Sequence, residues 1–180
     1  MVYVMLADGF EEIEAIEPVD ILRRGGVEVK TVSIKEETLV MGAHNIPVVA
    51  DMSVYDMTDV NDMEALILPG GAGHELLDAS NEVHGLINYA LSENIIIAAI
   101  CAAPSVLGKK MILSGKRATC FPGFEKYLYD AEIVSDKAVA DGKIVTARGA
   151  GAAKDFGFLL LTMLKDEKTA KELEKTMQYE

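Results

Sequence analysis

The chain has 180 residues, a formal net charge of −12 at pH 7, and 50% hydrophobic and 26% charged residues. This length and balance suffice to bury one core without disulfides, so we expect a single domain spanning residues 1–180. The acidic composition repels phosphate backbones and anionic lipid headgroups, and this disfavours nucleic-acid and membrane partners.

Short apolar runs alternate with helical spacing in the first third of the chain. The run Val2–Leu6 indicates a buried strand, Glu11–Arg24 has helical spacing with acids early and arginines late, and Val27–Ile34 alternates like a second strand. Between Leu39 and Val54, turn residues separate two β-rich pieces, which predicts a hairpin-like excursion.

The remaining elements continue this alternation. We predict strands at Ala65–Leu68 and Ile95–Ile100, a short strand at Arg117–Cys120, a hairpin with an Asp-Gly turn over Val139–Val145, and helices at Asn81–Glu93, after Cys101, at Ala152–Leu164 and at Lys165–Gln178. Apolar strands that alternate with helices are typical of a doubly wound α/β fold, a mostly parallel sheet covered on both faces.

In such folds the functional site lies beyond the carboxyl ends of the strands. That rule selects three loops, namely Ala7–Glu12, Pro69–Gly73 and the turn at Cys101. The start of the chain is typical of a strand and not of a signal peptide, and two cysteines fit a reducing compartment, so we expect a cytoplasmic protein.

Cys101 is the strongest candidate for chemistry. It stands between an apolar strand and a helix, among small side chains, which is the setting of a nucleophile elbow without the usual G-x-S-x-G signature. A helix start favours the thiolate, so we expect a pKa well below that of a free cysteine. The alternative is a small, inert core cysteine, and this is our expectation for Cys120.

Glu14 is the second candidate. It is one of several acids early in the first predicted helix, where such residues usually form a solvated face. If Glu14 instead reaches Cys101, the two groups disfavour each other's charge, and a partly buried carboxyl keeps its proton and acts as a general acid/base.

The glycine-rich loop Pro69–Gly73 can bind phosphate, form an oxyanion hole or simply turn the chain. It lacks the G-x-G-x-x-G spacing, and the acidic loop after the first strand repels a pyrophosphate, so we predict no nucleotide cofactor. The three histidines, His44, His74 and His84, are expected at the surface, and His74 is kept as a candidate because it adjoins the loop. We predict no metal site.

Several motifs together resemble the ThiJ/PfpI superfamily, nearest to the branch of the parkinsonism-associated protein and its bacterial relatives. They occur in the family's order over nearly the whole chain: Gly9–Glu14, Pro18–Asp20, Arg23-Arg24, Leu68–Gly71, Ala99–Pro104 and Arg148-Gly149. The resemblance implies a flavodoxin-like homodimer with a reactive Cys101 that oxidises readily to sulfinate and a Glu14 partner. It also implies oxyanion-binding amides at Gly71 and Ala102, beside Gly70.

Two departures from the family pattern affect the site. Phe121 stands where the human-type pattern has a histidine, and His44 is the nearest equivalent of a basic residue contributed by the partner subunit. His44, His74 and Arg148 are therefore candidates for accessory roles. Ala102 stands where the protease-like branches have a histidine, so peptidase activity is disfavoured.

The resemblance implies two alternative functions. The first is a cofactor-free enzyme of the glyoxalase or deglycase type, which acts on small 2-oxoaldehydes or their glycated adducts with Cys101 as nucleophile and Glu14 as acid/base. The second is an oxidative-stress sensor or chaperone that uses oxidation of Cys101. The same pair of residues serves both functions.

Overall fold

The computed structural model describes residues 1–179, which are built around one seven-stranded sheet. The strands run in the order β10-β11-β7-β6-β1-β2-β5, and only β10 is antiparallel to its neighbour. Their bounds are β1 Val2–Leu6, β2 Val29–Ser33, β5 Met52–Ser53, β6 Ala65–Leu68, β7 Ile96–Ile100, β10 Ala138–Asp141 and β11 Ile144–Ala147.

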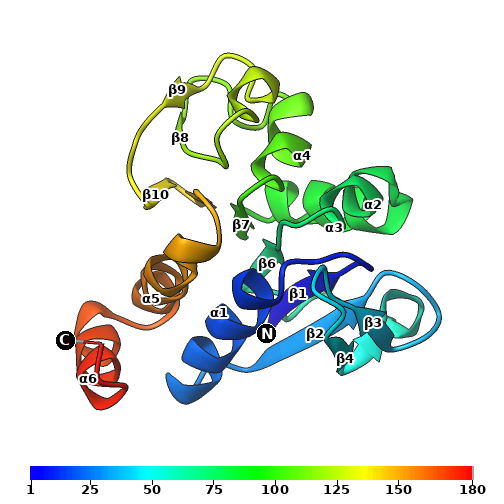
Figure 1. The fold of residues 1–180 in the computed structure, drawn as a ribbon, viewed down its shortest axis with the longest axis horizontal. Coiled ribbons are helices and arrows are strands. Elements are labelled where there is room, and N and C mark those ends of the chain that lie inside the picture. Colours follow the sequence, from blue (N-terminus) through cyan, green and yellow to red (C-terminus); the bar gives the residue numbers. More distant parts are fainter. Residues whose placement is uncertain (180) are drawn as a thin grey trace.

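Helices cover both faces of the sheet (Figure 1). Helices α1 (Glu12–Arg24) and α5 (Ala153–Leu164) pack on one face, with α6 (Glu167–Thr176) against α5. Helices α3 (Asn81–Ser92) and α4 (Pro104–Lys109) pack on the other, and α2 (His74–Ala79) contacts both of them. The doubly wound α/β fold predicted from the sequence is confirmed.

The two helical layers follow from the two-residue period of the strands. Val2, Val4 and Leu6 of β1 belong to the core cluster that contains α1 and α5 side chains, while Tyr3 and Met5 belong to the cluster with α3 and α4 side chains. A strand buried on both faces needs apolar residues at every position, and this explains the uninterrupted apolar runs.

The strand order sets the position of the functional site. Numbered along the chain, the five main parallel strands β1, β2, β6, β7 and β11 lie in the order 2-1-3-4-5, which is the flavodoxin-like order. The direction of winding reverses between β1 and β6. In folds of this type, ligands bind beyond the carboxyl ends of the strands at that switch point.

Smaller elements decorate this sheet. The predicted excursion is a hairpin of β3 (Leu39–Met41) and β4 (Pro47–Val49), and β8 (Arg117–Ala118) pairs with β9 (Glu132–Ile133) outside the main sheet. Helix α2 and strand β9 were not predicted, and β5, which falls within the predicted excursion, pairs with β2 in the main sheet. No helix among residues 1–179 is both long and apolar enough to span a membrane.

Candidate functional site

Three neighbouring strands, β1, β6 and β7, end at the same edge of the sheet, and the residues that follow them meet there. Glu14 lies in the first turn of α1 after β1, Gly70 follows β6, and Cys101 follows β7. The Gly70 amide donates to Glu14 Oε2 at 3.0 Å, and the Glu14 side chain is hydrogen-bonded to Cys101. The predicted Cys101–Glu14 pair is thus present.

The backbone at Cys101 has the conformation of a nucleophile elbow. Its φ is +65°, in the left-handed region that non-glycine residues rarely adopt. The Cys101 amide donates to the Ala147 carbonyl at 2.9 Å, and the Phe121 amide donates to the Cys101 carbonyl at 2.8 Å. These contacts hold the turn, which leaves the thiol partly accessible while β7 beneath it is fully buried.

Glu14 is buried in spite of its charge, with 1% of its surface exposed. Its apolar neighbours on α1 are instead exposed to solvent: Ile13 is 51% and Ile16 is 38% exposed. A buried carboxyl requires hydrogen-bond partners, and Glu14 has the amides of Gly70 and Ala150 as well as the Cys101 thiol. The solvated-face alternative for Glu14 is therefore excluded.

The environment shifts both groups of the pair. Burial raises the pKa of the Glu14 carboxyl to about 7, against the opposing effect of its hydrogen bonds to Cys101 and Gly70. Burial, and then the negative charge of Glu14, raise the pKa of the Cys101 thiol to about 12. Near neutral pH the pair therefore loses one proton and carries one negative charge.

The expectation of a lowered thiol pKa was wrong. It rested on a helix start after Cys101, but α4 has only six residues, and burial next to Glu14 outweighs it. The thiolate can still form without a second ionisation, because the thiol proton can pass to the Glu14 carboxylate. The total charge of the pair is then unchanged.

Two backbone amides face the sulfur, as the family resemblance implied. The amides of Gly71 and Ala102 are hydrogen-bonded to Cys101 and favour its thiolate. Gly71 has a φ of +77°, and a Cβ there would lie 2.4 Å from the Gly9 carbonyl oxygen, so only glycine fits this turn. Two converging amides are the usual components of an oxyanion hole.

The shared ionisation predicts the pH dependence of Cys101 alkylation. We expect the rate with iodoacetamide to rise as the pH passes about 7, where the pair loses its first proton, and then to level off, because the second ionisation lies near 12. In Glu14→Gln the plateau should disappear. Residue-resolved mass spectrometry over a pH series measures both, and a wild-type midpoint near that of an ordinary thiol, about 8.5, contradicts the shared ionisation.

Substitution of Gly70 should disrupt the pair. A Cβ at this position would lie 2.5 Å from both the Cys101 Cβ and Glu14 Oε2, so Gly70→Ala must displace them. Overpacking of this kind costs about 1–3 kcal/mol. We expect chemical denaturation to show this loss, together with slower Cys101 alkylation. Gly85→Ala is the control, since no atom of the described residues 1–179 lies within 4 Å of its Cβ position on α3, and equal stability of the two variants would contradict the prediction.

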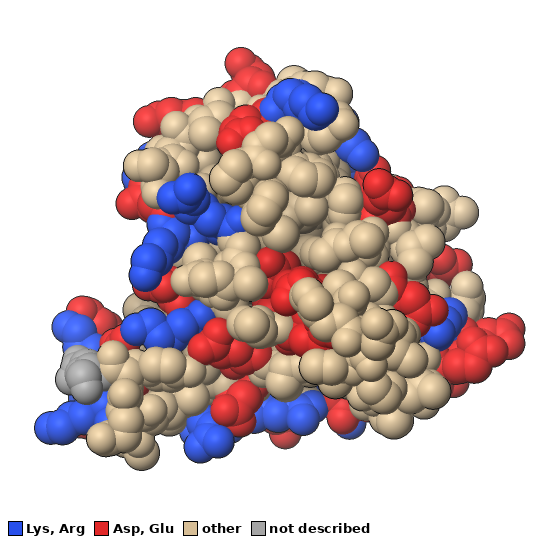
Figure 2. Space-filling view, viewed as in Figure 1, with Lys and Arg blue, Asp and Glu red and all other residues tan. Residues whose placement is uncertain are grey.

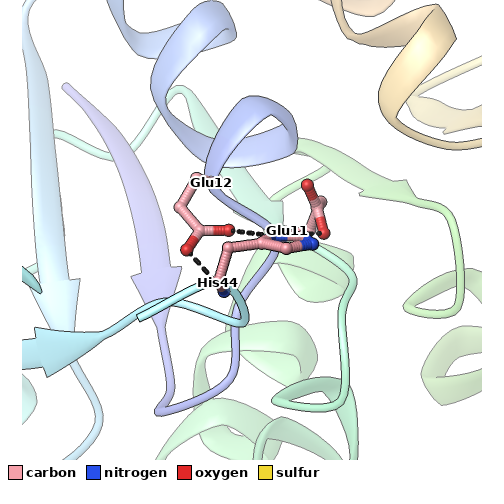
Figure 3. A group of neighbouring side chains, drawn as sticks. All are labelled: Glu11, Glu12 and His44. Atoms are coloured by element: carbon pink, nitrogen blue, oxygen red, sulfur yellow. Dashed lines mark hydrogen bonds and ion pairs between the residues drawn. The ribbon is translucent and has the colours of Figure 1, made fainter. Parts of the chain in front are cut away.

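His44 lies beside the acidic start of α1 (Figure 3). Its Nδ1 is 2.9 Å from Glu12 Oε2 and 3.6 Å from Glu11 Oε2, and its amide donates to Glu12 Oε1 at 2.8 Å. Among residues 1–179, the group of side chains whose potential metal-ligand atoms lie close enough to share an ion, within 4.8 Å of one another, consists of these three. Hydrogen bonds already occupy both Glu12 oxygens, and the cluster fastens the β3–β4 hairpin to α1.

The other accessory candidates lie at different places around the site. His74, expected at the surface, is only 8% exposed, because the Phe124 ring packs edge-on against it, and its Nδ1 lies 2.9 Å from the Gly71 carbonyl oxygen at the start of the unpredicted helix α2. His84 is half-buried on α3. Arg148 is exposed and immediately precedes Gly149, while Cys120 is buried.

Gly149 and Phe121 also contribute to the site, in ways that the spacing of motifs did not reveal. A Cβ on Gly149 would lie 3.9 Å from the Cys101 sulfur, 3.7 Å from Glu14 Oε1 and 3.3 Å from the Phe121 ring. Phe121 is 48% exposed, so it lies at the solvent side of Gly149. The pairing of β11 with β7, which sequence alone does not fix, brings Gly149 to Cys101, and the Phe121 amide donates to the Cys101 carbonyl.

The comparison with known proteins agrees with this fold: residues 1–163 match the DJ-1/PfpI family. The chain belongs to this family, in its DJ-1 branch. It is 36% identical over 175 residues to Protein DJ-1 homolog B of Arabidopsis thaliana, covering 96% of this chain but 40% of that protein. The chain thus spans less than half the length of that plant relative.

Other relatives match along most of their length. A protein named deglycase from Pyrococcus abyssi is 30% identical over 152 residues, which cover 83% of this chain and 90% of that one. Among solved structures, a DJ-1 superfamily protein from Salmonella typhimurium superposes with a TM-score of 0.93 at 32% identity, covering 99% and 98% of the two chains. Oxidized DJ-1 of Toxoplasma gondii gives 0.92 at 29% identity, covering 98% and 97%.

Proposed function

We propose that this protein is a cofactor-free, cysteine-dependent enzyme that converts small 2-oxoaldehydes, or their early adducts with proteins, into 2-hydroxy acids. The observation that carries the proposal is the hydrogen-bonded pair of Cys101 and buried Glu14, with the amides of Gly71 and Ala102 directed at the sulfur. The Pyrococcus relative named deglycase supports an enzymatic role.

The first step is addition to the aldehyde. The Cys101 thiol passes its proton to Glu14, and the resulting thiolate adds to the aldehyde carbon to give a hemithioacetal. The amides of Gly71 and Ala102 stabilise the oxyanion that forms on the former aldehyde oxygen, which then takes the proton back from Glu14 and leaves Glu14 as a carboxylate.

The second step moves a proton between the two carbons of the substrate. Glu14, as carboxylate, removes the hydrogen of the former aldehyde carbon to give an enediolate, and then returns a proton to the neighbouring carbon. The product is a thioester of the 2-hydroxy acid, which water hydrolyses to free Cys101. A carboxyl with a pKa of about 7 can both accept and donate a proton near neutral pH.

The second candidate function is a redox sensor or chaperone. The half-buried Cys101 can be oxidised stepwise to a sulfinate, which a protonated Glu14 and the two amides can hydrogen-bond. The relative from Toxoplasma, whose structure is of an oxidized form, favours this candidate. A chaperone role predicts activity against aggregation that increases with oxidation.

One experiment separates the two functions. Methylglyoxal consumption and lactate formation are measured with reduced protein and with protein pretreated with hydrogen peroxide, alongside an aggregation assay on a client protein. The enzyme proposal predicts lactate from the reduced protein alone. An absence of lactate, with client protection that appears only after oxidation, would instead favour the sensor.

We also expect a homodimer in solution. Beside the exposed Ile13 and Ile16, the β3–β4 hairpin exposes 55% of Ile46 and 70% of Val49, and the His44–Glu12 contact fastens it to α1. Apolar surface of this kind is typical of an interface. Sedimentation equilibrium should show twice the chain mass of 19.4 kDa. Val49→Lys should weaken the dimer, and a wild-type monomer at micromolar concentration contradicts it.

A further inference from the structure

A shallow groove of about 370 Å³ begins at the wall of the Cys101 site. It is lined by Phe121, Pro122, Lys137, Arg148 and the segment 149–152. Gly149 borders both the groove and the sulfur, since a Cβ on it would lie 3.9 Å from Cys101 Sγ, and Phe121, which also lines the groove, donates its amide to the Cys101 carbonyl. A substrate whose carbonyl carbon meets Cys101 can therefore extend into this groove.

The groove carries positive charge in a chain whose net charge is −12. The Arg148 amide donates to the Lys137 carbonyl at 2.9 Å, which holds the two cationic residues side by side. Asp155 lies 3.5 Å from Lys137 Nζ and offsets part of its charge. Among residues 1–179, the Arg148 guanidinium makes one long hydrogen bond, 3.5 Å to the carbonyl of Ser135, which lines a neighbouring pocket of about 260 Å³ that Arg148 also borders. Arg148 is therefore the principal cation available to a ligand.

The opposite side of the site is acidic. Glu11 and Glu12 lie at the start of α1, and the exposed His44 partly neutralises them. Figure 2 shows acidic side chains near the centre of this face and basic side chains beside them, where β10 lies in Figure 1. An anionic group on a substrate is repelled by the acidic start of α1 and attracted by the basic groove. The charge distribution therefore orients the substrate.

We propose that the preferred substrates are 2-oxoaldehydes with a carboxylate or phosphate group, which Arg148 binds in this groove while the carbonyl carbon meets Cys101. Arg148 acts as a specificity-determining residue, supported by Lys137. An arginine suits this role because its planar guanidinium pairs with two oxygens of a carboxylate or phosphate. The substrate class rests on the proposed function, but the preference for an anion at Cys101 can be measured without turnover.

The test compares two alkylating reagents of similar size, iodoacetate and iodoacetamide, at Cys101. A change in thiol ionisation alters both alkylation rates by the same factor and cancels in their ratio. The ratio therefore reports the charge around Cys101. We expect Arg148→Glu to lower the iodoacetate/iodoacetamide ratio about fivefold to tenfold, the size expected when two unit charges change near a partly solvated site. Arg148→Gln should give an intermediate value, and added salt should lower the wild-type ratio.

Lys143→Glu is the matched control. It changes the net charge equally, and Lys143 lies exposed at the β10–β11 turn, at the opposite ends of these strands from Lys137 and Arg148. Its ratio should equal that of the wild type. The proposal is overturned if Arg148→Glu leaves the ratio unchanged, or if Lys143→Glu lowers it as much, since the effect would then come from net charge alone.

The substrate class is tested with hydroxypyruvaldehyde and its phosphate ester, which share one reacting group and differ in charge. The wild type should have the higher kcat/KM for the ester, mainly through a lower KM, and Arg148→Glu should reverse the order. If neither compound is turned over while the alkylation ratio still depends on Arg148, the proposed enzymatic function fails and the anion site stands. Turnover of both with no dependence on Arg148 refutes the anion site alone.

Discussion

Replacement of Cys101 by serine should lower methylglyoxal turnover by several orders of magnitude, to a residual rate that still exceeds the uncatalysed reaction because the oxyanion-binding amides remain. A serine hydroxyl has nearly the same shape, but it is far less nucleophilic, and Glu14, with a pKa of about 7, is too weak a base to activate it. The folded structure should persist, because the partly exposed Cys101 thiol contributes little to the core. Lactate formation and thermal unfolding measure the two effects.

Cys120 provides the matched control. Cys120 is buried, with 4% of its surface exposed. Burial, followed by the charge of Glu125, raises the pKa of its thiol to about 12, as for Cys101. Within residues 1–179, the acidic influence on Cys120 is the charge of Glu125, and no carboxyl is hydrogen-bonded to its thiol as Glu14 is to Cys101. Cys120→Ser should therefore lower stability modestly and keep turnover, and full activity in Cys101→Ser would remove the nucleophile from the proposal.

Glu14→Gln should keep the fold and lower turnover by about 10²–10⁴-fold, the range typical for loss of a general acid/base. Glutamine keeps the size of the side chain and can still hydrogen-bond, but it cannot carry a proton between the two substrate carbons. The kinetics of methylglyoxal consumption measure the loss. Turnover at the wild-type rate would show that another group carries the proton, and His74 would be the first to examine.

Oxidation should respond differently to the same position. The glutamine amide can still donate to a Cys101 sulfinate, so peroxide should still produce this species in Glu14→Gln, as read by intact-protein mass. Glu14→Leu removes the donor and should impair both turnover and sulfinate formation. Equal sulfinate yields in the two variants would show that hydrogen bonding from position 14 does not stabilise the oxidised cysteine.

The sequence predicted the fold because the fold depends on local patterns, whereas the Cys101–Glu14 pair was implied by the family resemblance. Apolar strands that alternate with helices specify a parallel sheet, and the carboxyl-end rule then brings the turn at Cys101 and the start of α1 to one edge. The burial of Glu14 was harder to predict from the sequence. The first helix exposes Ile13 and buries Glu14, so its apolar pattern alone points to the wrong face.

The remaining errors come from tertiary contacts. The raised pKa of Cys101 depends on burial and on the charge of Glu14, neither of which the helix start after Cys101 reveals. His74 is buried because Phe124, fifty residues later in the chain, packs edge-on against it with ring centroids 5.3 Å apart. Gly149 reaches the sulfur only through the pairing of β11 with β7. Patterns within a short segment cannot encode such contacts.

The most direct test of the shared role of Cys101 and Glu14 is a double-mutant cycle in kcat/KM for methylglyoxal, with Cys101→Ser, Glu14→Gln and the double variant. Residues that act as one unit are strongly non-additive, because loss of either disables the other. We predict that the double variant is no slower than Cys101→Ser. A double variant slower by the full product of the two single losses would show that the residues act independently and would contradict the account.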